Sequence, residues 1–285
     1  MAFEALQTLD DDGLYLPVVG AWAEEKYRLI AGYAQMFSSA MRNKWDVRVY
    51  LDLFAAAGRA RIKDTDRIVA TSASLAVGVR DPFDAYVFCE IDQRCIEALK
   101  QRVRRDTPAI RATFIAGDCN TRTEEILRAI PSPSRGRSVL SFCVVDPCKM
   151  RDLQFSTIQA LAERFVDFFV LIPSYMDAHR NLEPYNRPGN SVVADLLGNP
   201  HWRDRWSTRH TEAGPRDFGA FVVDNFGLAR RNLGFQYGGP DDTVPVLDKH
   251  LLLYHLAFFS RHERGRDFWR RAKRSGTGQL ELGSW

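Results

Sequence analysis

The stretch VYLDLFAAAGRARI, Val49 to Ile62, decides the fold that we expect for this chain. Its first half is nearly continuous in apolar residues, which is typical of a strand in a parallel sheet covered on both faces. Its second half changes to small residues, as does the turn after the first strand of a nucleotide-binding fold. Because this turn carries three alanines and a single glycine, Gly58, it departs from an ordinary glycine-rich loop.

Strand and helix patterns alternate beyond this stretch. Five such repeats are the pattern of right-handed strand–helix–strand crossovers, so the predicted fold class is α/β, a Rossmann-like doubly wound sheet. The segment 59–68 is predicted to be a polar loop between the first strand and its helix. The predicted strands are 47–54, 85–91, 112–118, 138–146 and 166–173, and the predicted helices between them are 72–79, 93–105, 121–130 and 155–165.

The remaining segments are predicted to join this core in a single domain, 1–285. Residues 19–45 place aromatic and apolar side chains at helical spacing. After 173 the pattern loosens into helical stretches, and 250–260 is a long apolar strand. In the stretch 261–274, seven Arg and Lys stand against two acids. The predicted organisation is an N-terminal helical segment (1–45), the five-strand core (46–173), a helical insertion (174–245), and the last strand with a basic C-terminal helix (246–285).

Composition excludes several classes of protein. With 285 residues, of which 45% are hydrophobic and 26% charged, the chain can bury a full core. We expect it to be neither exported nor membrane-bound, and to be cytoplasmic, because its N-terminus is acidic and it lacks the ~20 apolar residues of a membrane span. Five cysteines without paired spacing favour reduced thiols and no metal site. The net charge of +3 is too small to indicate nucleic-acid binding by itself.

Acidic residues follow four successive predicted strands. Ligands of open parallel sheets bind beyond the carboxyl ends of the strands. There, a carboxylate can accept hydrogen bonds from both ribose hydroxyls, a second acid can accept one from an adenine amino group, and the N–H groups of the first turn can bind a carboxylate. S-adenosylmethionine combines these three groups. The strand-end residues are Asp52, then Glu90 with Asp92, then Asp118 with Cys119, and finally Asp146.

A nicotinamide cofactor fits this arrangement less well. Its pyrophosphate requires a glycine-rich turn that leads directly into a helix, with an acid about 20 residues further on. Here a polar loop follows the turn instead. Each acid taken singly can equally be a solvated strand end, so the joint placement of the acids is what favours S-adenosylmethionine.

Six segments of the chain form a recognisable set: VGAWAEEKYRLIAGYAQMFSSAM, VYLDLFAAAGRARI, DPFDAYVFCEID, GDCN, VVDPCKM and FWRRAKR. Together they resemble the three-Cys-motif partner family, TcmP, a bacterial group. The resemblance covers nearly the whole chain and implies a fold of the class I methyltransferase type. It also implies an association with a separate protein that bears the three cysteines and resembles radical-SAM enzymes.

Our first hypothesis is a SAM-dependent methyltransferase. Its cofactor site departs from the family pattern at Ala56, where the family usually has glycine. If that position requires a positive φ, the alanine costs about 1 kcal/mol or more, which weakens binding without abolishing it. Asp52 and the turn to Gly58, with Phe54 and Ala56, are assigned to the methionine end, Glu90 to the ribose and Asp118 to the adenine. Asp92 and Cys119 are further candidate cofactor-binding residues.

The candidate catalytic residues are Asp146, Pro147 and Cys148. Asp146 and Pro147 can supply the acceptor that amino methyltransferases offer to the exocyclic amine of a flipped base, although the aromatic residue of that motif is absent here. Tyr175 can supply a ring from beyond the fifth strand. With the basic C-terminal helix, this favours a nucleic-acid base as the substrate. A more specific interpretation is that Cys148 is a nucleophile. A simpler interpretation is that Cys148 replaces the aromatic residue of the motif in a pocket wall, without functional effect.

Our second hypothesis belongs to a different class. In this hypothesis, the departures at Ala56 and Cys148 reflect a loss of catalytic activity. The chain is then a degenerate methyltransferase fold that serves as the partner subunit of the three-Cys-motif protein. Of the histidines, His179 is the candidate for a substrate pocket. Five aromatic residues of the insertion are predicted to serve mainly in packing: Trp202, Trp206, Phe218, Phe221 and Phe226.

Overall fold

The computed structural model describes residues 6–213, 218–237, 239, 243–248 and 251–276. Its main sheet has seven strands, in the order β6-β5-β2-β7-β8-β10-β9. The sheet extends to both sides of β2, with β5 and β6 on one side and β7, β8, β10 and β9 on the other. β10 runs antiparallel to its neighbours β8 and β9. The predicted α/β class is therefore confirmed. The strands are β2 (Val47–Asp52), β5 (Ala85–Glu90), β6 (Ala112–Ala116), β7 (Val139–Val145), β8 (Val166–Ile172), β9 (Val244–Asp248) and β10 (Leu251–Phe259).

The chain divides into two compact units. The first comprises Met1–Val145 and Arg164–Val166, and the second comprises Asp146–Glu163 and Asp167–Trp285. The single-domain organisation stays a prediction. No helix among the described residues has the length and apolar character needed to cross a bilayer.

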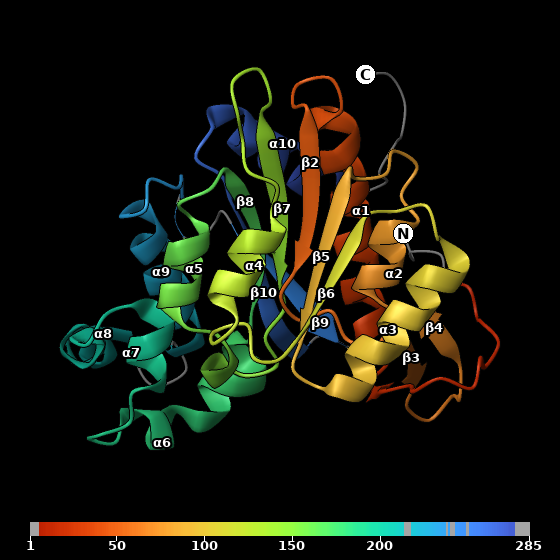
Figure 1. Cartoon of the computed structure of the whole chain (residues 1–285). Helices are drawn as coiled ribbons and strands as arrows, with labels where there is room; N and C mark the ends of the chain where they lie inside the picture. The colour runs from red at the N-terminus through yellow and green to blue at the C-terminus, as the bar shows by residue number, and fades with distance from the viewer. Residues whose placement is uncertain (1–5, 214–217, 238, 240–242, 249–250, 277–285) are drawn as a thin grey trace. The chain divides into compact units, whose positions relative to one another are not determined.

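The first unit is built around β2, whose six residues are all buried. Phe37 of α1 packs against Phe142 of β7, with ring centroids 4.7 Å apart, and Tyr50, Phe83 and Tyr86 extend the same aromatic core. Figure 1 shows α1, α2 and α3 as neighbouring helices beside β5. The helices of this unit are α1 (Ala23–Met41), α2 (Ser72–Val77), α3 (Gln93–Asp106) and α4 (Thr123–Ala129).

A small second sheet replaces the predicted polar loop at 59–68, so that prediction was wrong. Here β3 (Arg59–Ile62) pairs antiparallel with β4 (Ile68–Ala70), and β1 (Val18–Val19) pairs parallel with β3. In β3, Ala60 and Ile62 are buried and alternate with Arg59 and Arg61, which are less buried, and this is the period-two pattern of a strand. The charged side chains hid this alternation in the sequence.

The second unit packs helices around β8, which is buried along its whole length. Its predicted packing aromatics are confirmed, since Trp202, Trp206, Phe218, Phe221 and Phe226 are each at most 3% exposed. The prediction missed the edge strand β9, which contains a proline, and the short helix α6 within a predicted loop. The helices are α5 (Phe155–Leu161), α6 (Leu182–Asn186), α7 (Val192–Leu197), α8 (Trp202–Ala213), α9 (Phe218–Arg231) and α10 (Glu263–Gly276), with short turns η1 (Met150–Asp152), η2 (Ser174–Ala178) and η3 (His179–Asn181).

Candidate functional site

Hydrogen bonds join the segments that follow β2, β5 and β6. The N–H of Ala55 donates to the Cys89 carbonyl at 3.0 Å, and the N–H of Gly117 donates to the Glu90 carbonyl at 2.9 Å. Between them, the N–H of Ala56 donates to Oε2 of Glu90 at 2.8 Å. The structure thus brings together two of the predicted cofactor residues, Ala56 and Glu90, at the carboxyl ends of adjacent strands.

The loop Leu53–Gly58, which we call the cofactor loop, makes a tight turn with two left-handed residues. Ala56 has φ +51°, so the strain expected of an alanine in this region, about 1 kcal/mol, applies. Gly58 has φ +80°, and a Cβ there would lie 2.6 Å from Ser74 Oγ and 2.9 Å from Leu99 Cδ1. Glycine is therefore required at 58 for two reasons, whereas at 56 an alanine is accommodated under strain.

Glu90 is a half-buried carboxylate that backbone groups hold at both oxygens. Its Oε1 accepts from the N–H of Asp92 at 2.9 Å, and its Oε2 accepts from Ala56. Burial raises the pKa of Glu90, and these N–H donors oppose that shift. Each oxygen keeps a further lone pair, so the carboxylate can still accept hydrogen bonds from ribose hydroxyls.

Ile91 is a residue of this site that sequence reasoning missed. It lies between Glu90 and Asp92 and is 70% exposed, one of few large hydrophobic residues so exposed among the described residues. The signal in the sequence was an isoleucine placed just after a strand, flanked by two acids. Its exposed side chain is an apolar surface on the residue next to Glu90 in the sequence.

Asp52 lies beneath the cofactor loop and is fully buried. Its Oδ1 accepts from the N–H of Phe54 at 3.0 Å, and its Oδ2 accepts from the hydroxyls of Tyr50 and Ser72 at 3.2 and 3.1 Å. The carboxylate therefore supports the start of the loop from inside. A direct contact with the methionine end of a cofactor stays a prediction, as it does for the half-buried Phe54.

Asp92 and Asp118 both have evident local roles. Asp92 caps α3, because its Oδ1 accepts from the N–H of Arg94 at 2.9 Å, and it also forms an ion pair with that arginine at 2.7 Å. Asp118 Oδ1 accepts from the N–H and the side-chain amide of Asn120 at 2.9 and 2.8 Å. Cys119 is buried, which raises its pKa. Contacts of these three residues with ribose or adenine stay predictions.

The candidate catalytic residues Asp146, Pro147 and Cys148 directly follow β7. Asp146 is half-buried, Pro147 is buried, and Cys148 is exposed, as is the next residue, Lys149. The other four cysteines are buried, and none of the five is in a disulfide. The structure thus places an exposed thiol beside an exposed ammonium group, while the assigned roles stay predictions.

Asp177 fixes the loop that carries these residues, and sequence reasoning missed it. It is 3% exposed, and its Oδ2 accepts from the N–H of Met150 and the hydroxyl of Tyr185, both at 2.7 Å. A second bond, from the N–H of Lys149 to Asp152 Oδ2 at 2.8 Å, closes the turn η1. An acid four residues after the end of a predicted strand was the available signal.

Two histidines lie near the carboxyl end of β8 in the second unit. The rings of Tyr175 and His179 stack with centroids 5.0 Å apart. Ser174 Oγ and His255 Nδ1 are hydrogen-bonded at 2.7 Å, and burial lowers the pKa of His255. Tyr175 and His179 are thus neighbours at a strand end, and their predicted part in a substrate pocket stays a prediction.

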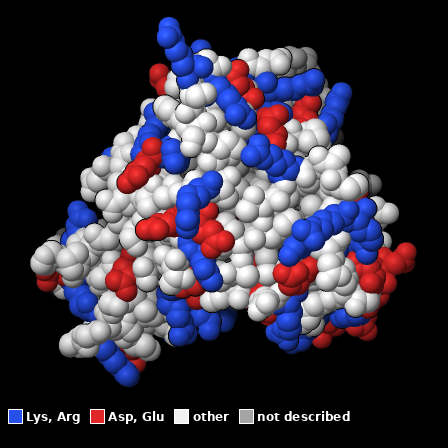
Figure 2. Space-filling model, in the orientation of Figure 1, with Lys and Arg blue, Asp and Glu red and all other residues white. Residues whose placement is uncertain are grey.

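Metal binding and surface charge give no further candidate. Among the residues that the structure describes, no cluster of three or more His, Cys, Asp and Glu side chains has the arrangement of a metal site. Figure 2 shows Lys and Arg mixed with Asp and Glu over the face that it draws. On this face, basic and acidic side chains are therefore interspersed, and no broad basic surface is formed.

Comparisons with known proteins identify structural likenesses at low identity. No family model matches this chain, and no curated protein is similar to it. A protein from Legionella pneumophila is 10% identical with a TM-score of 0.46, over 85% of this chain and 90% of its own. An O-methyltransferase from Bacillus cereus in complex with S-adenosylhomocysteine (SAH) is 9% identical with a TM-score of 0.44, over 81% of this chain and 80% of its own.

A third likeness is to magnesium protoporphyrin IX methyltransferase from Synechocystis with bound SAH. It is 10% identical with a TM-score of 0.40, over 83% of this chain and 86% of its own. At such values these likenesses identify no activity. The resemblance to the three-Cys-motif partner family stays a prediction, and the function must be argued from this chain's own residues.

Proposed function

We propose that this chain binds S-adenosylmethionine at the cofactor loop and transfers its methyl group to a nitrogen of a nucleic-acid base or a similar acceptor. One observation carries the proposal: the N–H of Ala56 donates to the Glu90 carboxylate at 2.8 Å. This contact sets a carboxylate beside a tight backbone turn at the ends of the adjacent strands β2 and β5, where doubly wound sheets bind nucleotides.

The residues at this point fit the cofactor in size and chemistry. The turn packs closely against the helices behind it at Gly58, because a Cβ there would fall within 3 Å of Ser74 and Leu99. Glu90 has acceptor lone pairs for the two ribose hydroxyls. Ile91, which is 70% exposed, offers an apolar surface for the adenine.

Bound S-adenosylmethionine supplies an electrophilic methyl group. In this proposal Asp146 accepts a hydrogen bond from the amino group to be methylated. Pro147, which is buried, restricts the backbone next to that carboxylate. Transfer of the methyl group would break its bond to the sulfonium sulfur and release SAH, and the nitrogen would lose its proton to solvent or to Asp146.

The substrate class and the partner come from weaker arguments. The nucleic-acid base rests on the Asp146–Pro147 pair and the basic α10, and the three-Cys-motif protein rests on the resemblance described above. The strain at Ala56 favours a second candidate, a degenerate fold that acts as a partner subunit. The two candidates differ in whether the loop binds the cofactor.

Calorimetry with S-adenosylmethionine and with SAH separates them. We expect micromolar binding to the wild-type chain, its loss in Glu90→Ala, and tighter binding in Ala56→Gly. Glu97→Ala is the matched control, because this exposed glutamate of α3 pairs with Lys100 and lies away from the cofactor loop. Absence of binding in the wild type with binding in Ala56→Gly indicates a site that has been switched off, and absence in both contradicts the proposal.

A further inference from the structure

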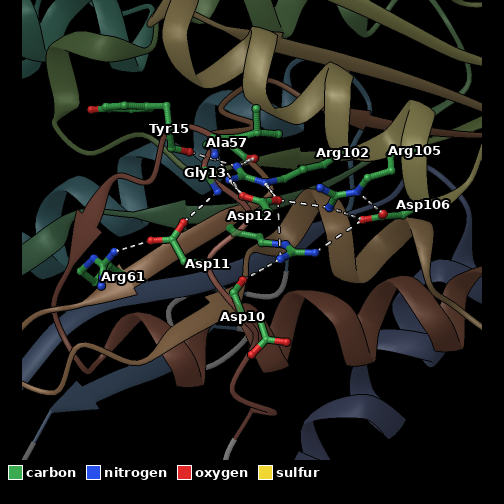
Figure 3. A network of polar contacts seen from close by, with 12 residues as sticks. Asp10, Asp11, Asp12, Gly13, Tyr15, Ala57, Arg61, Arg102, Arg105 and Asp106 are labelled. Atoms are coloured by element: carbon green, nitrogen blue, oxygen red, sulfur yellow. Dashed lines mark hydrogen bonds and ion pairs between the residues drawn. The ribbon is translucent and has the colours of Figure 1, made fainter.

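A buried arginine links the N-terminal segment to the cofactor loop (Figure 3). We call residues 10–15 the N-terminal strap. Arg102 of α3 donates to Asp12 twice, from Nε to Oδ2 at 2.9 Å and from Nη2 to Oδ1 at 2.7 Å. Its Nη1 donates to the carbonyls of Ala57 at 2.6 Å and of Tyr15 at 3.0 Å. The same guanidinium therefore holds both the strap and the residue next to Ala56.

This ion pair is enclosed by protein. Arg102 is 1% exposed, and the Asp12 side chain is 9% exposed. The hydrogen bond from Arg102, with a further one from Arg105, holds the pKa of Asp12 well below its usual range. A buried pair of this kind brings little net stability compared with apolar packing, because both charges lose their hydration. What it does bring is a fixed geometry, here at the Ala57 carbonyl.

Apolar contacts seat the strap on the same elements. Leu14 and Tyr15 pack against the cluster of Ala57, Cys95 and Ala98, so the strap covers the outer side of the cofactor loop. The Arg94 guanidinium lies over the Tyr15 ring, 4.4 Å from its centroid. Because Arg94 also pairs with Asp92, the strap extends as far as the segment that follows Glu90.

We propose that Asp12 and Arg102 are positioning residues of the cofactor site, through which the N-terminal strap supports the cofactor loop. Arg102 holds the Ala57 carbonyl, Asp12 fixes Arg102, and together they keep Ala56 in its left-handed conformation, in which its N–H reaches Glu90. This inference rests on the proposed function. Its physical basis is that an alanine favours backbone conformations other than φ +51°, so contacts from outside the loop have to hold Ala56 in this conformation.

The first test is a cycle of variants of the full chain, measured as SAH affinity. Asp12→Asn removes the negative charge and should weaken binding about fivefold, the factor that corresponds to the strain of one left-handed alanine. In the Ala56→Gly background the same change should weaken binding less, because glycine adopts the turn without restraint. A purely structural role of Asp12 predicts equal effects in both backgrounds.

Two further variants serve as a conservative substitution and as a control for this test. Arg102→Lys keeps a positive charge opposite Asp12 but loses the planar donors that reach the carbonyls, so it tests the carbonyl contact without leaving Asp12 unpaired. Asp11→Asn is the matched control, because Asp11 belongs to the strap and pairs with Arg61, an exposed contact away from Ala57. It should leave the affinity unchanged.

Amide hydrogen exchange without cofactor separates this inference from the proposed function. The amides of residues 55–58 should exchange faster in Asp12→Asn and Arg102→Lys than in the wild type, and at the wild-type rate in Asp11→Asn. If the wild type binds no SAH, the proposed function fails while exchange still decides whether the strap restrains the loop. Unchanged exchange in both variants overturns the inference, whatever the affinity.

Discussion

Two loops that follow parallel strands, the cofactor loop after β2 and the segment Asp146–Asp152 after β7, are held in opposite ways. The cofactor loop is restrained along its whole length, by Asp52 beneath it, Glu90 beside it and Arg102 behind it. The segment after β7 is held at its far end, where Asp177 and Asp152 accept from backbone N–H groups.

The difference shows what each loop offers to a ligand. The restraints on the cofactor loop bind its backbone and leave no space for a larger residue at Gly58, which suits a ligand of fixed shape. The segment after β7 instead leaves three residues exposed, Cys148, Lys149 and Arg151. Side chains that project from a backbone fixed nearby are suited to contact with a variable substrate.

The largest expected effect is that of Gly58→Val. A branched side chain at φ +80° is strained and collides with Ser74 and Leu99, so we expect a loss of about 3 kcal/mol in the free energy of unfolding, together with loss of SAH binding. Gly136→Val is the control, because Gly136 has φ +78° but nothing within 4 Å. Chemical denaturation measures both, and equal losses would show that strain alone is responsible.

Removal of the anchor of the second loop should cost somewhat less. Asp177→Ala leaves the N–H of Met150 and the hydroxyl of Tyr185 without their buried acceptor, for which we expect about 2 kcal/mol of destabilisation in urea unfolding. Tyr185→Phe, which removes one of these bonds, should cost about 1 kcal/mol. The exposed Asp195 bonds to Ser191, and its change to alanine is a control expected to leave stability nearly unchanged.

A third expectation concerns pH and the restraint on Glu90. Burial raises the pKa of Glu90 above its ordinary 4.5, so its carboxylate becomes protonated at a higher pH than an exposed glutamate does. The protonated form accepts weaker hydrogen bonds, so SAH affinity should fall as the pH decreases through this raised pKa and recover above it. Titration calorimetry between pH 4 and pH 8, roughly the range in which carboxyl groups with raised pKa values titrate, measures this. A wild-type profile that persists in Glu90→Gln would assign the pH dependence to another group.

The smallest effect on stability is expected at Cys148. Its exposed thiol should react quickly with a thiol reagent in the folded chain, whereas the four buried cysteines should react after denaturation. Burial raises the pKa of Cys89 and of Cys95 to about 12, which further slows their reaction because the thiolate is the reactive form. Cys148→Ser should abolish the fast phase and change stability by less than about 0.5 kcal/mol. A second fast thiol in the folded chain would contradict the burial described here.

Part of this protein was readable from its sequence. The alternation of apolar strands with helical patterns predicted the α/β class and each of the five core strands to within a few residues, because burial on both faces of a parallel sheet leaves a local signature. The small residues of the cofactor loop and the acids that end the strands were visible for the same reason. The hairpin β3–β4 and the edge strand β9 were not, since charged residues and a proline mask short strands.

Tertiary structure alone decided which distant residues are in contact and which backbone conformation these contacts impose. Asp12, Ala57 and Arg102 lie in three separate segments of the chain, and nothing in their spacing predicts that one guanidinium joins them. Likewise, the sequence shows an alanine at 56 but not its left-handed φ, which depends on the restraints around it. Local periodicity determines which elements form, whereas long-range packing determines which groups meet, because the chain must fold before those groups can pair.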